Sequence, residues 1–542
     1  MTDIEIPLEK DRHGWYRFFE ILPGALSWLM LAMPFILSVI NVDFAAAFVL
    51  AYLLINFVRG IAGAIRSVAA FRTMKHHQQL PWRKMLEELE AGEVLDGGAV
   101  RPKWHYDAML HMKLDPNRPG PSDTIHAIII ATVKETRETL EETIKSVINS
   151  DFDMKQVMLI LAYEGRAGQE TEDRANDLIK QYRYEFMDAF AVKHPAGIPN
   201  ELIGKGGNIT YAGRELQKYL ERNAIDPNRV VVTTLDADNR PDKNYLGAVT
   251  YIFSVCPDPL HASFQPVALF TNNIWDAPAP MRVIATGNSL YHLVSSLRQH
   301  ALRNFSAHAQ PMAALIETDF WSVRTVVEDG HHYWRSYFRF DGHYQVFPVH
   351  LPIYQDAVLG ETYRRTIKAQ FKQIARWAYG ASDIAYFANQ GFLKKNNVPK
   401  FDLFAKFWRL LEGHVTWAVG PILVLGGGFV PSLFSHDAVQ VYYLPQIVSR
   451  VQTVALITAL ITVFLALRTL PPRPARYRRH RNLWMILQWA YLPFTTLAFN
   501  SLAALYSQTR LIFKRYMSKF DVTEKAVVLK SGKKISSGVE KL

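Results

Sequence analysis

Two aspartates, Asp236 and Asp238, follow directly after the apolar run VVVTTL. Carboxylates this close together at a strand end can share a hard divalent cation, and Mg²⁺ or Mn²⁺ held in this way keeps room for substrate phosphates. Such a cation neutralises charge that develops on a departing diphosphate. Because Asp-x-Asp also occurs in ordinary turns, its position after a buried strand is what makes this pair a candidate metal and nucleotide site.

A second acidic pair, Glu328-Asp329, follows the run TVV about 90 residues later. A carboxylate in a cleft can act as a general base on a hydroxyl nucleophile, so both residues are candidate catalysts. The same pair would suit the first turn of a helix, where acidic side chains are favoured. The pair by itself leaves both interpretations open.

Further positions have side chains suited to phosphate or sugar. Gln373, Arg376 and Trp377 share one face of an amphipathic helix predicted within 357–390. Trp offers a flat apolar platform, and Arg can bind a phosphate through two hydrogen bonds. The same residue types also suit a helix that lies on a membrane surface. Lys205, in the string KGGN, can meet a phosphate as a point charge or stand in a flexible turn.

Strands and helices alternate in the middle of the chain. The runs HAIIIATV, VMLILAYE and RVVVTTLDAD have the length of buried strands, and helical periodicity separates the first two. This pattern predicts a mostly parallel sheet covered on both faces. Ligands bind beyond the carboxyl ends of such strands, where Thr132, Glu164 and Asp236 stand.

Long apolar blocks flank this region. The first block, about 21–58, is too long for one membrane span and is interrupted by Asn41 and Asp43. It therefore predicts two helices joined by a tight turn, with a buried soluble hairpin as the alternative. Two further spans are predicted at about 414–434 and 446–467.

The end of the chain is rich in arginine. The segment 468–481 contains six arginines and no acid, which indicates the cytoplasmic side of a membrane. The block 483–506 contains Pro493 and precedes more basic residues, so we expect it to be interfacial or re-entrant. The tail then stays in the cytoplasm.

The formal net charge is +11, and the basic residues crowd beside the apolar blocks. That placement favours a membrane-lipid surface and no nucleic-acid partner. The single cysteine, Cys256, excludes an intramolecular disulfide and a cysteine-based zinc site. We expect no cleavable signal peptide, because the N-terminus lacks a basic n-region.

Taken in order, these pieces resemble the processive branch of glycosyltransferase family 2, the cellulose and hyaluronan synthases. The resemblance covers about residues 122–390 and the tail, through Thr132 to Glu135, KGGN, DAD, ED, QIARW and FDVTEK. It implies an α/β GT-A (Rossmann-like) catalytic domain between N- and C-terminal transmembrane helices, a UDP-sugar donor, Mg²⁺ or Mn²⁺, and a single-displacement inverting reaction.

The resemblance also implies roles for individual residues. Asp236 would contact the nucleotide and Asp238 the metal, while Asp329 would be the base. The nucleotide pocket and the diphosphate would involve Thr132, Glu135, Glu164 and Lys205. The donor diphosphate and acceptor would be held by Gln373, Arg376 and Trp377. The tail residues that look like a gating loop over bound UDP are Phe520, Val522, Thr523 and Lys525.

The chain departs from the family pattern in places. Glu164 stands where the family usually has Asp, so its contact with the nucleotide base departs from the family pattern. The string SAHAQPM replaces a glycine-rich segment, so we expect His308 and Gln310 to face an unusual acceptor.

The predicted organisation has six parts: an N-terminal segment and transmembrane hairpin (1–75), a connector (76–121), the cytosolic GT-A domain (122–355), amphipathic interface helices (356–410), a C-terminal membrane region (411–508) and a cytosolic tail (509–542). We expect a multi-pass protein of the plasma (inner) membrane with a cytoplasmic catalytic domain. By the resemblance, the predicted product is a β-linked polysaccharide whose synthesis is coupled to export. One alternative is single-sugar transfer to a lipid. Another, from a different class, is a membrane transporter with a nucleotide-sensing domain.

Overall fold

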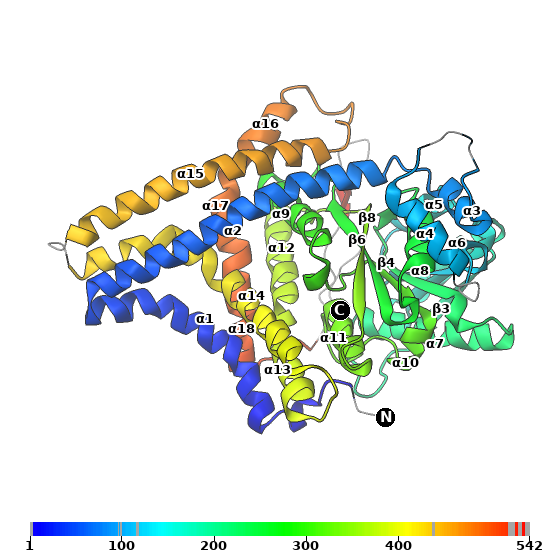
Figure 1. Cartoon of the computed structure of the whole chain (residues 1–542), viewed down its shortest axis with the longest axis horizontal. Helices are drawn as coiled ribbons and strands as arrows, with labels where there is room; N and C mark the ends of the chain where they lie inside the picture. Colours follow the sequence, from blue (N-terminus) through cyan, green and yellow to red (C-terminus); the bar gives the residue numbers. More distant parts are fainter. Residues whose placement is uncertain are drawn as a thin grey trace.

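The computed structural model of the chain consists of a sheet domain beside a group of long apolar helices (Figure 1). It describes residues 4–95, 97, 100–114, 119–435, 439–518, 526–528 and 534–536. The main sheet has eight strands in the order β3-β2-β1-β4-β7-β6-β8-β5. Their bounds are β1 Ile125–Thr132, β2 Val157–Glu164, β3 Asp188–His194, β4 Val230–Asp236, β5 Arg240–Pro241, β6 Ala262–Phe270, β7 His308–Pro311 and β8 Gln345–Gln355. Two short strands, β9 Ala526–Val528 and β10 Lys534–Ser536, pair with each other.

The first half of the sheet is parallel, as the three apolar runs predict. β2 pairs with β1 and β3, and β1 pairs with β4, all in parallel. The second half is mixed, because β7 runs antiparallel to both β4 and β6, while β8 is parallel to β6. The prediction of a mostly parallel sheet is therefore correct only for the first half, since an apolar run does not reveal the direction of its partner strand.

Helices cover both faces of the sheet. Ile128 and Ile130 of β1 point into one apolar cluster, and Ala127 and Ile129 point into another on the opposite face. This two-sided burial explains why β1 is apolar throughout rather than alternating. The helices of the domain are α5 Arg137–Ile148, α6 Gln169–Tyr182, α7 Lys205–Arg222, α8 Tyr245–Val255, α9 Ala279–Ser296, α10 Met312–Glu317 and α11 Glu328–Arg339.

The segment 76–121, which we interpreted as a connector, contains α3 Trp82–Ala91 and α4 Lys103–Leu114. Trp82 is 2% exposed and belongs to the same apolar cluster as β1 and β2. Arg101 donates two hydrogen bonds to the buried Glu88 carboxylate, at 2.9 and 2.7 Å. Because a buried charge is tolerated when it is paired, this contact stabilises the segment itself. The segment is attached to the sheet domain through His105 of α4, whose ring contacts the Tyr251 hydroxyl of α8 at 2.8 Å.

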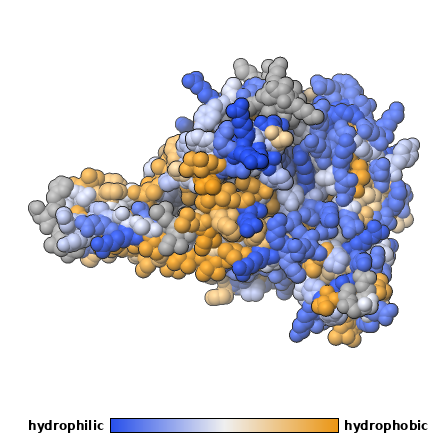
Figure 2. All heavy atoms as spheres, turned by 90° about the horizontal axis from the view of Figure 1, so that it is seen from above, coloured by the Kyte–Doolittle hydropathy of each residue, from blue (hydrophilic) through white to orange (hydrophobic). Residues whose placement is uncertain are grey.

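Four helices are long and apolar enough to cross a membrane: Gly14–Ile40, Val42–His77, Lys400–Leu433 and Val441–Thr469. They correspond to α1 Gly14–Ile40, α2 Val42–His77, α14 Lys400–Gly426 and α15 Val439–Thr469. The predicted break in the first apolar block is confirmed, because the Asn41 side chain accepts from the Asp43 amide and caps α2. These helices carry large exposed apolar side chains, visible in Figure 2 as an orange surface beside the hydrophilic domain.

The last apolar block forms an irregular helical rod between those helices and the sheet domain (Figure 1). It comprises α16 Arg481–Leu487, α17 Leu492–Thr495 and α18 Leu502–Ile512, joined by a 3₁₀ turn and a π turn. Ser27 of α1 donates to Gln508 of α18 at 2.7 Å, inside the protein. The rod also packs against α12 Tyr363–Ala378, which is followed by α13 Asp383–Ala388.

The rod ends beside the start of α1. The Tyr516 hydroxyl donates to Glu20 at 2.8 Å, and the Met517 amide donates to the Tyr379 hydroxyl at 3.4 Å. Tyr379 directly follows α12, so the tail begins next to the sheet domain. Its cytoplasmic location, like the number of true membrane spans, stays a prediction.

Candidate functional site

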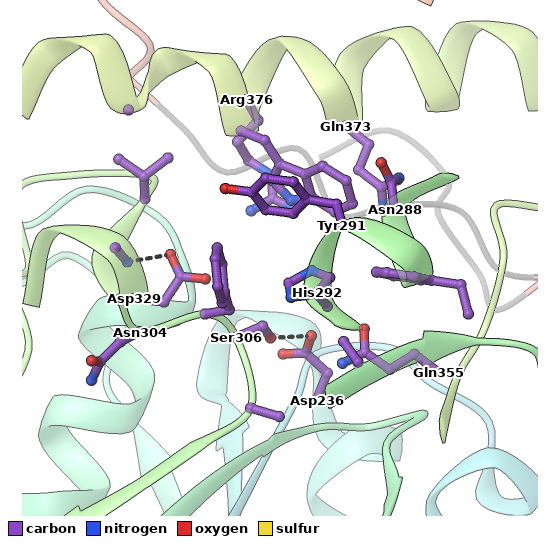
Figure 3. Close-up of a pocket in the computed structure, with 18 of the residues that line it drawn as sticks. Asp236, Asn288, Tyr291, His292, Asn304, Ser306, Asp329, Gln355, Gln373 and Arg376 are labelled. Carbon is purple, nitrogen blue, oxygen red and sulfur yellow. Dashed lines mark hydrogen bonds between the residues drawn. The ribbon is translucent and has the colours of Figure 1, made fainter. Parts of the chain in front are cut away.

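One large cavity of about 730 Å³ lies at the carboxyl ends of β1, β2 and β4. Figure 3 shows it between these strands and α12, with α9 at one side. The structure brings the following predicted site residues to this cavity: Thr132, Glu135, Glu164, Lys205, Asp236, Asp238, Glu328, Asp329, Gln373, Arg376 and Trp377. Thr132, Glu164 and Asp236 meet here because neighbouring parallel strands finish at one edge, and the helices α7, α11 and α12 contribute most of the other side chains.

Asp236 lies in a network of charged and hydroxyl groups. Lys205 Nζ, at the start of α7, donates to Asp236 Oδ1 at 2.6 Å, and Ser306 Oγ donates to Asp236 Oδ2 at 2.6 Å. Burial opposes the charge on Lys205, but Asp236 and Glu328 raise its pKa. The ammonium group is therefore charged. It brings positive charge to the cavity beside Asp236, the residue expected to contact the nucleotide.

Asp238 lies deeper, with 2% of the residue exposed. The Asp356 backbone amide donates to Asp238 Oδ2 at 2.8 Å, and the Asn272 side chain donates to the Asp238 carbonyl at 3.0 Å. Among the residues that the structure describes, no group of three His, Cys, Asp or Glu side chains could hold a metal ion. The donor set of Asp236 and Asp238 suits Mg²⁺ or Mn²⁺ only if substrate phosphates supply further oxygen ligands.

The acidic pair begins α11. Burial raises the pKa of Glu328 to about 7, together with the negative charge of Asp329, while Lys205 and Arg376 oppose the change. Burial also raises the pKa of Asp329, against the hydrogen bond from the Gly330 amide to Asp329 Oδ1 at 2.7 Å. Two adjacent carboxyl groups with raised pKa values are suited to proton transfer near neutral pH.

The helix α12 packs on the C-terminal rod and also lines the cavity. Ile374 and Ala375 are buried against Phe499 and Ala503 of the rod, while Arg376 lines the cavity. Gln373 accepts a hydrogen bond from Gln370 at 3.1 Å, and the Trp377 ring lies 6.0 Å from the Phe270 ring. The amphipathic pattern of α12 thus reflects packing on the rod on one side and a polar cavity on the other.

The strand ends of β1 and β2 carry acids with local partners. Glu135 accepts from the Thr132 hydroxyl at 2.8 Å and from the Val133 amide at 2.7 Å, so it stabilises its own loop. Glu164 accepts from Arg166 at 3.1 Å and pairs with His194 at 3.2 Å. Burial disfavours a charged His194, but Glu164 and Glu201 raise its pKa to about 9, so the charge on Glu164 is offset.

The expectation for His308 and Gln310 is wrong. Both lie on β7, between β4 and β6, and both are almost fully buried. Trp321 donates to His308 Nε2 at 3.3 Å, and Gln310 Oε1 contacts His332 at 3.0 Å. Within the described chain, neither residue lines the cavity. A short strand in the middle of a sheet buries both faces, which the string SAHAQPM does not reveal.

The helix α9 forms a wall of the cavity that the sequence did not predict. Asn288, Tyr291 and His292 line it, together with Ser306 after the helix (Figure 3). Tyr291 keeps 57% of its surface exposed. In the sequence, the helical spacing of these three α9 residues was the one signal of a shared face, but Asn, Tyr and His are too common on helices to predict a site.

The predicted gating residues Phe520, Val522, Thr523 and Lys525 lie outside the described residues.

No protein-family model matches the chain, and no curated protein matches it by sequence. Solved structures similar to it include the mannosyltransferase PcManGT from Pyrobaculum calidifontis with GDP-Man and Mn²⁺, at 13% identity and a TM-score of 0.42, covering 92% of this chain and 100% of that one. Another is S. aureus TarS 1–349 with UDP-GlcNAc, at 10% identity and a TM-score of 0.35, covering 75% and 95%.

A third is glucosyl-3-phosphoglycerate synthase from Mycobacterium tuberculosis with Mn²⁺, UDP and glucosyl-3-phosphoglycerate, at 13% identity and a TM-score of 0.29, covering 56% of this chain and 87% of that one. TM-scores below 0.5 do not establish a common fold.

Proposed function

We propose that the chain is a membrane-bound, inverting glycosyltransferase of the family 2 type that extends a polysaccharide from a UDP-sugar. One observation carries the proposal. The Asp-x-Asp strand end, the acidic pair of α11 and the Arg376 side of α12 converge on one cavity, although they are far apart in sequence. Acidic groups for a metal and a base, with cations for a diphosphate, are the parts that sugar transfer requires.

In the proposed reaction, Asp329 takes the proton from an acceptor hydroxyl as the hydroxyl oxygen attacks the anomeric carbon of the donor. The bond from that carbon to the diphosphate breaks, and its electron pair leaves with UDP. Attack from the opposite face converts an α-linked donor into a β-linked product. Much of the rate comes from holding the two reactants in line.

The leaving diphosphate needs positive charge. Arg376 can bind it through two hydrogen bonds, and Lys205 adds a second cation beside Asp236. Mg²⁺ or Mn²⁺, when bound with the donor at Asp238 and Asp236, would supply further neutralisation of the developing charge. Thr132, Glu135 and Glu164 lie on the strand ends where the nucleotide would bind.

The lining of the cavity on its membrane side favours a carbohydrate acceptor. The cavity extends from α12 to α14 and the C-terminal rod, where its polar and aromatic lining residues are Arg409, Glu412, His414, Trp417, Thr495, Thr496 and Asn500. Hydroxyl groups of a sugar chain find hydrogen-bond partners on such a wall, and its rings find an indole face. An acyl chain would prefer an aliphatic lining, so we favour a growing polysaccharide over a lipid acceptor.

The test is a panel of radiolabelled UDP-sugars given to the purified full chain in lipid nanodiscs with Mg²⁺ or Mn²⁺, followed by product sizing. We expect one UDP-sugar to enter a high-molecular-weight product with release of UDP. Asp329→Asn should lose activity by roughly 10²- to 10⁴-fold, whereas Asp319→Asn, at an exposed ion pair with Arg214, should be active. A small lipid-soluble product would instead support the glycolipid alternative. No transfer from any UDP-sugar would overturn the proposal.

A further inference from the structure

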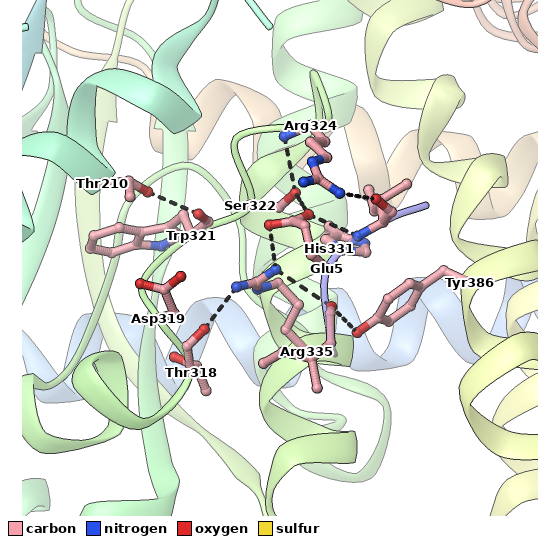
Figure 4. Close-up of polar contacts among 12 residues, drawn as sticks. Glu5, Thr210, Thr318, Asp319, Trp321, Ser322, Arg324, His331, Arg335 and Tyr386 are labelled. Atoms are coloured by element: carbon pink, nitrogen blue, oxygen red, sulfur yellow. Dashed lines mark hydrogen bonds and ion pairs between the residues drawn. The ribbon is translucent and has the colours of Figure 1, made fainter. Parts of the chain in front are cut away.

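The segment before the first membrane helix reaches into the sheet domain. Ile4, Glu5 and Ile6 lie beside α11 and α13, more than 300 residues away in sequence (Figure 4). Glu5 is the centre of these contacts. Its two carboxylate oxygens bind different elements, because Oε1 accepts from Ser322 at 2.6 Å and Oε2 accepts from Arg335 at 2.8 Å.

Arg335 is a buried cation on α11, two turns after Glu328. It is 1% exposed. Its guanidinium also donates to the Thr318 carbonyl at 2.7 Å. Burial disfavours ionisation of Glu5, but Arg335 and Ser322 lower its pKa below the usual value, so this is a charged pair. A buried charge without its partner is strongly unfavourable, which ties the N-terminal segment to α11.

The other oxygen of Glu5 holds the loop that leads into the acidic pair. Ser322 lies in this loop, and Arg324 of the same loop donates to the Ile6 carbonyl at 3.0 Å. On its other side the loop is bound to the region of α7. Thr210 donates to the Trp321 carbonyl at 2.9 Å.

The first turn of α7 touches the same loop directly. A Cβ atom at Gly206 would lie 2.5 Å from the Ser322 carbonyl oxygen and 3.2 Å from Glu328 Cβ, so only glycine permits this approach. Gly206 follows Lys205, the partner of Asp236. The loop held by Glu5 and the start of the acidic pair are therefore both packed against α7 at the residue next to Lys205.

The segment also binds α13. The Tyr386 hydroxyl donates to the Ile4 carbonyl at 2.7 Å. Asp383, one turn earlier on α13, lines the cavity and pairs with His331 of α11 at 2.8 Å. Three supports of the site thus meet at residues 4–6, and the chain continues from there into α1.

We propose that Glu5 is a positioning residue that clamps the loop 318–327 and α11, and so sets the acidic pair Glu328-Asp329 against Lys205 and the donor. The clamp makes the segment before the membrane helix α1 a part of the catalytic support. This inference rests on the proposed function for the expected change in kcat. The expected change in hydrogen exchange does not depend on that function.

The test compares Glu5→Gln with Glu9→Gln, an exposed glutamate four residues later in the same segment. Since a misplacement of about 1 Å can cost roughly 100-fold in rate, we expect Glu5→Gln to lower kcat by about 10- to 100-fold. The Kd for UDP should change less than about twofold. Hydrogen exchange should speed up in residues 318–332 and not in α5. Glu9→Gln should match the wild type in all three measurements.

A double variant, Glu5→Gln with Arg335→Met, separates two effects of losing Glu5. One is the loss of the tie that positions the loop, and the other is the cost of leaving the Arg335 charge buried without its carboxylate. Removing both partners should recover the melting temperature but not kcat, because the tie itself is missing. Recovery of both would overturn the proposal, as would a kcat for Glu5→Gln within about twofold of the wild type. If the wild type transfers no sugar, unchanged exchange in 318–332 of Glu5→Gln would still refute the clamp, and faster exchange would support it.

Discussion

Replacing Glu328 by Gln changes the ionisation of the acidic pair while keeping the size of the side chain. Glu328 is 3% exposed at the start of α11, beside Asp329. Burial and the charge of Asp329 raise its pKa from the usual 4.5 to about 7. This difference favours the protonated carboxyl in the folded protein by about 3 kcal/mol, as an order of magnitude.

The sign of the effect on stability follows from where the proton is held. Between about pH 4.5 and 7 the folded protein keeps a proton that the unfolded chain has released, so stability falls as pH rises through this range. The stability that the protonated Glu328 carboxyl contributes is fully present below about pH 4.5 and lost above about pH 7. Gln cannot ionise, so the variant should gain up to about 3 kcal/mol over the wild type between about pH 5 and 8. At roughly 2–4 °C per kcal/mol, the gain in melting temperature is at most about 12 °C.

The assay is thermal unfolding of the purified full chain, followed by tryptophan fluorescence at a series of pH values. The control is Glu170→Gln in the first turn of α6, where the side chain is 92% exposed. We expect the melting-temperature difference between Glu328→Gln and wild type to grow with pH, and the control difference to stay constant. A difference for Glu328→Gln that does not change with pH would refute the reasoning, because Glu328 would then ionise without a penalty from burial.

Three further substitutions test the cavity. Asp329→Asn should lower kcat by roughly 10²- to 10⁴-fold with the Kd for UDP unchanged, since a general base supplies about that factor; activity within about threefold of wild type would contradict the assignment. Lys205→Met removes the cation beside Asp236 and should weaken UDP binding in isothermal titration, with little loss of stability because the Asp236 side chain is 32% exposed; equal affinity would exclude a role in donor binding. Arg376→Lys keeps the charge but loses the two-pronged geometry, so the KM for the donor should rise about tenfold or more, and an unchanged KM would show that charge alone suffices.

Local patterns were enough to predict several features of this protein. The parallel strands could be predicted because each is a continuous apolar run, buried on both faces. The break at Asn41 could be predicted because a polar residue in an apolar block caps a helix through a local contact. The grouping of Asp236, Asp329 and Arg376 followed from motif order and strand-end placement, and all three line the cavity.

Tertiary structure decided what depends on partners far apart in the chain. The antiparallel strand β7, the packing of α3 and α4 on the sheet, and the α9 wall of the cavity have no local signature. Neither the pairing of Lys205 with Asp236 nor that of Glu5 with Arg335 can be read from spacing, since the partners of the second pair are 330 residues apart. Periodicity records which face of an element is buried, whereas the identity of the burying partner emerges only when the sheet and helices pack together.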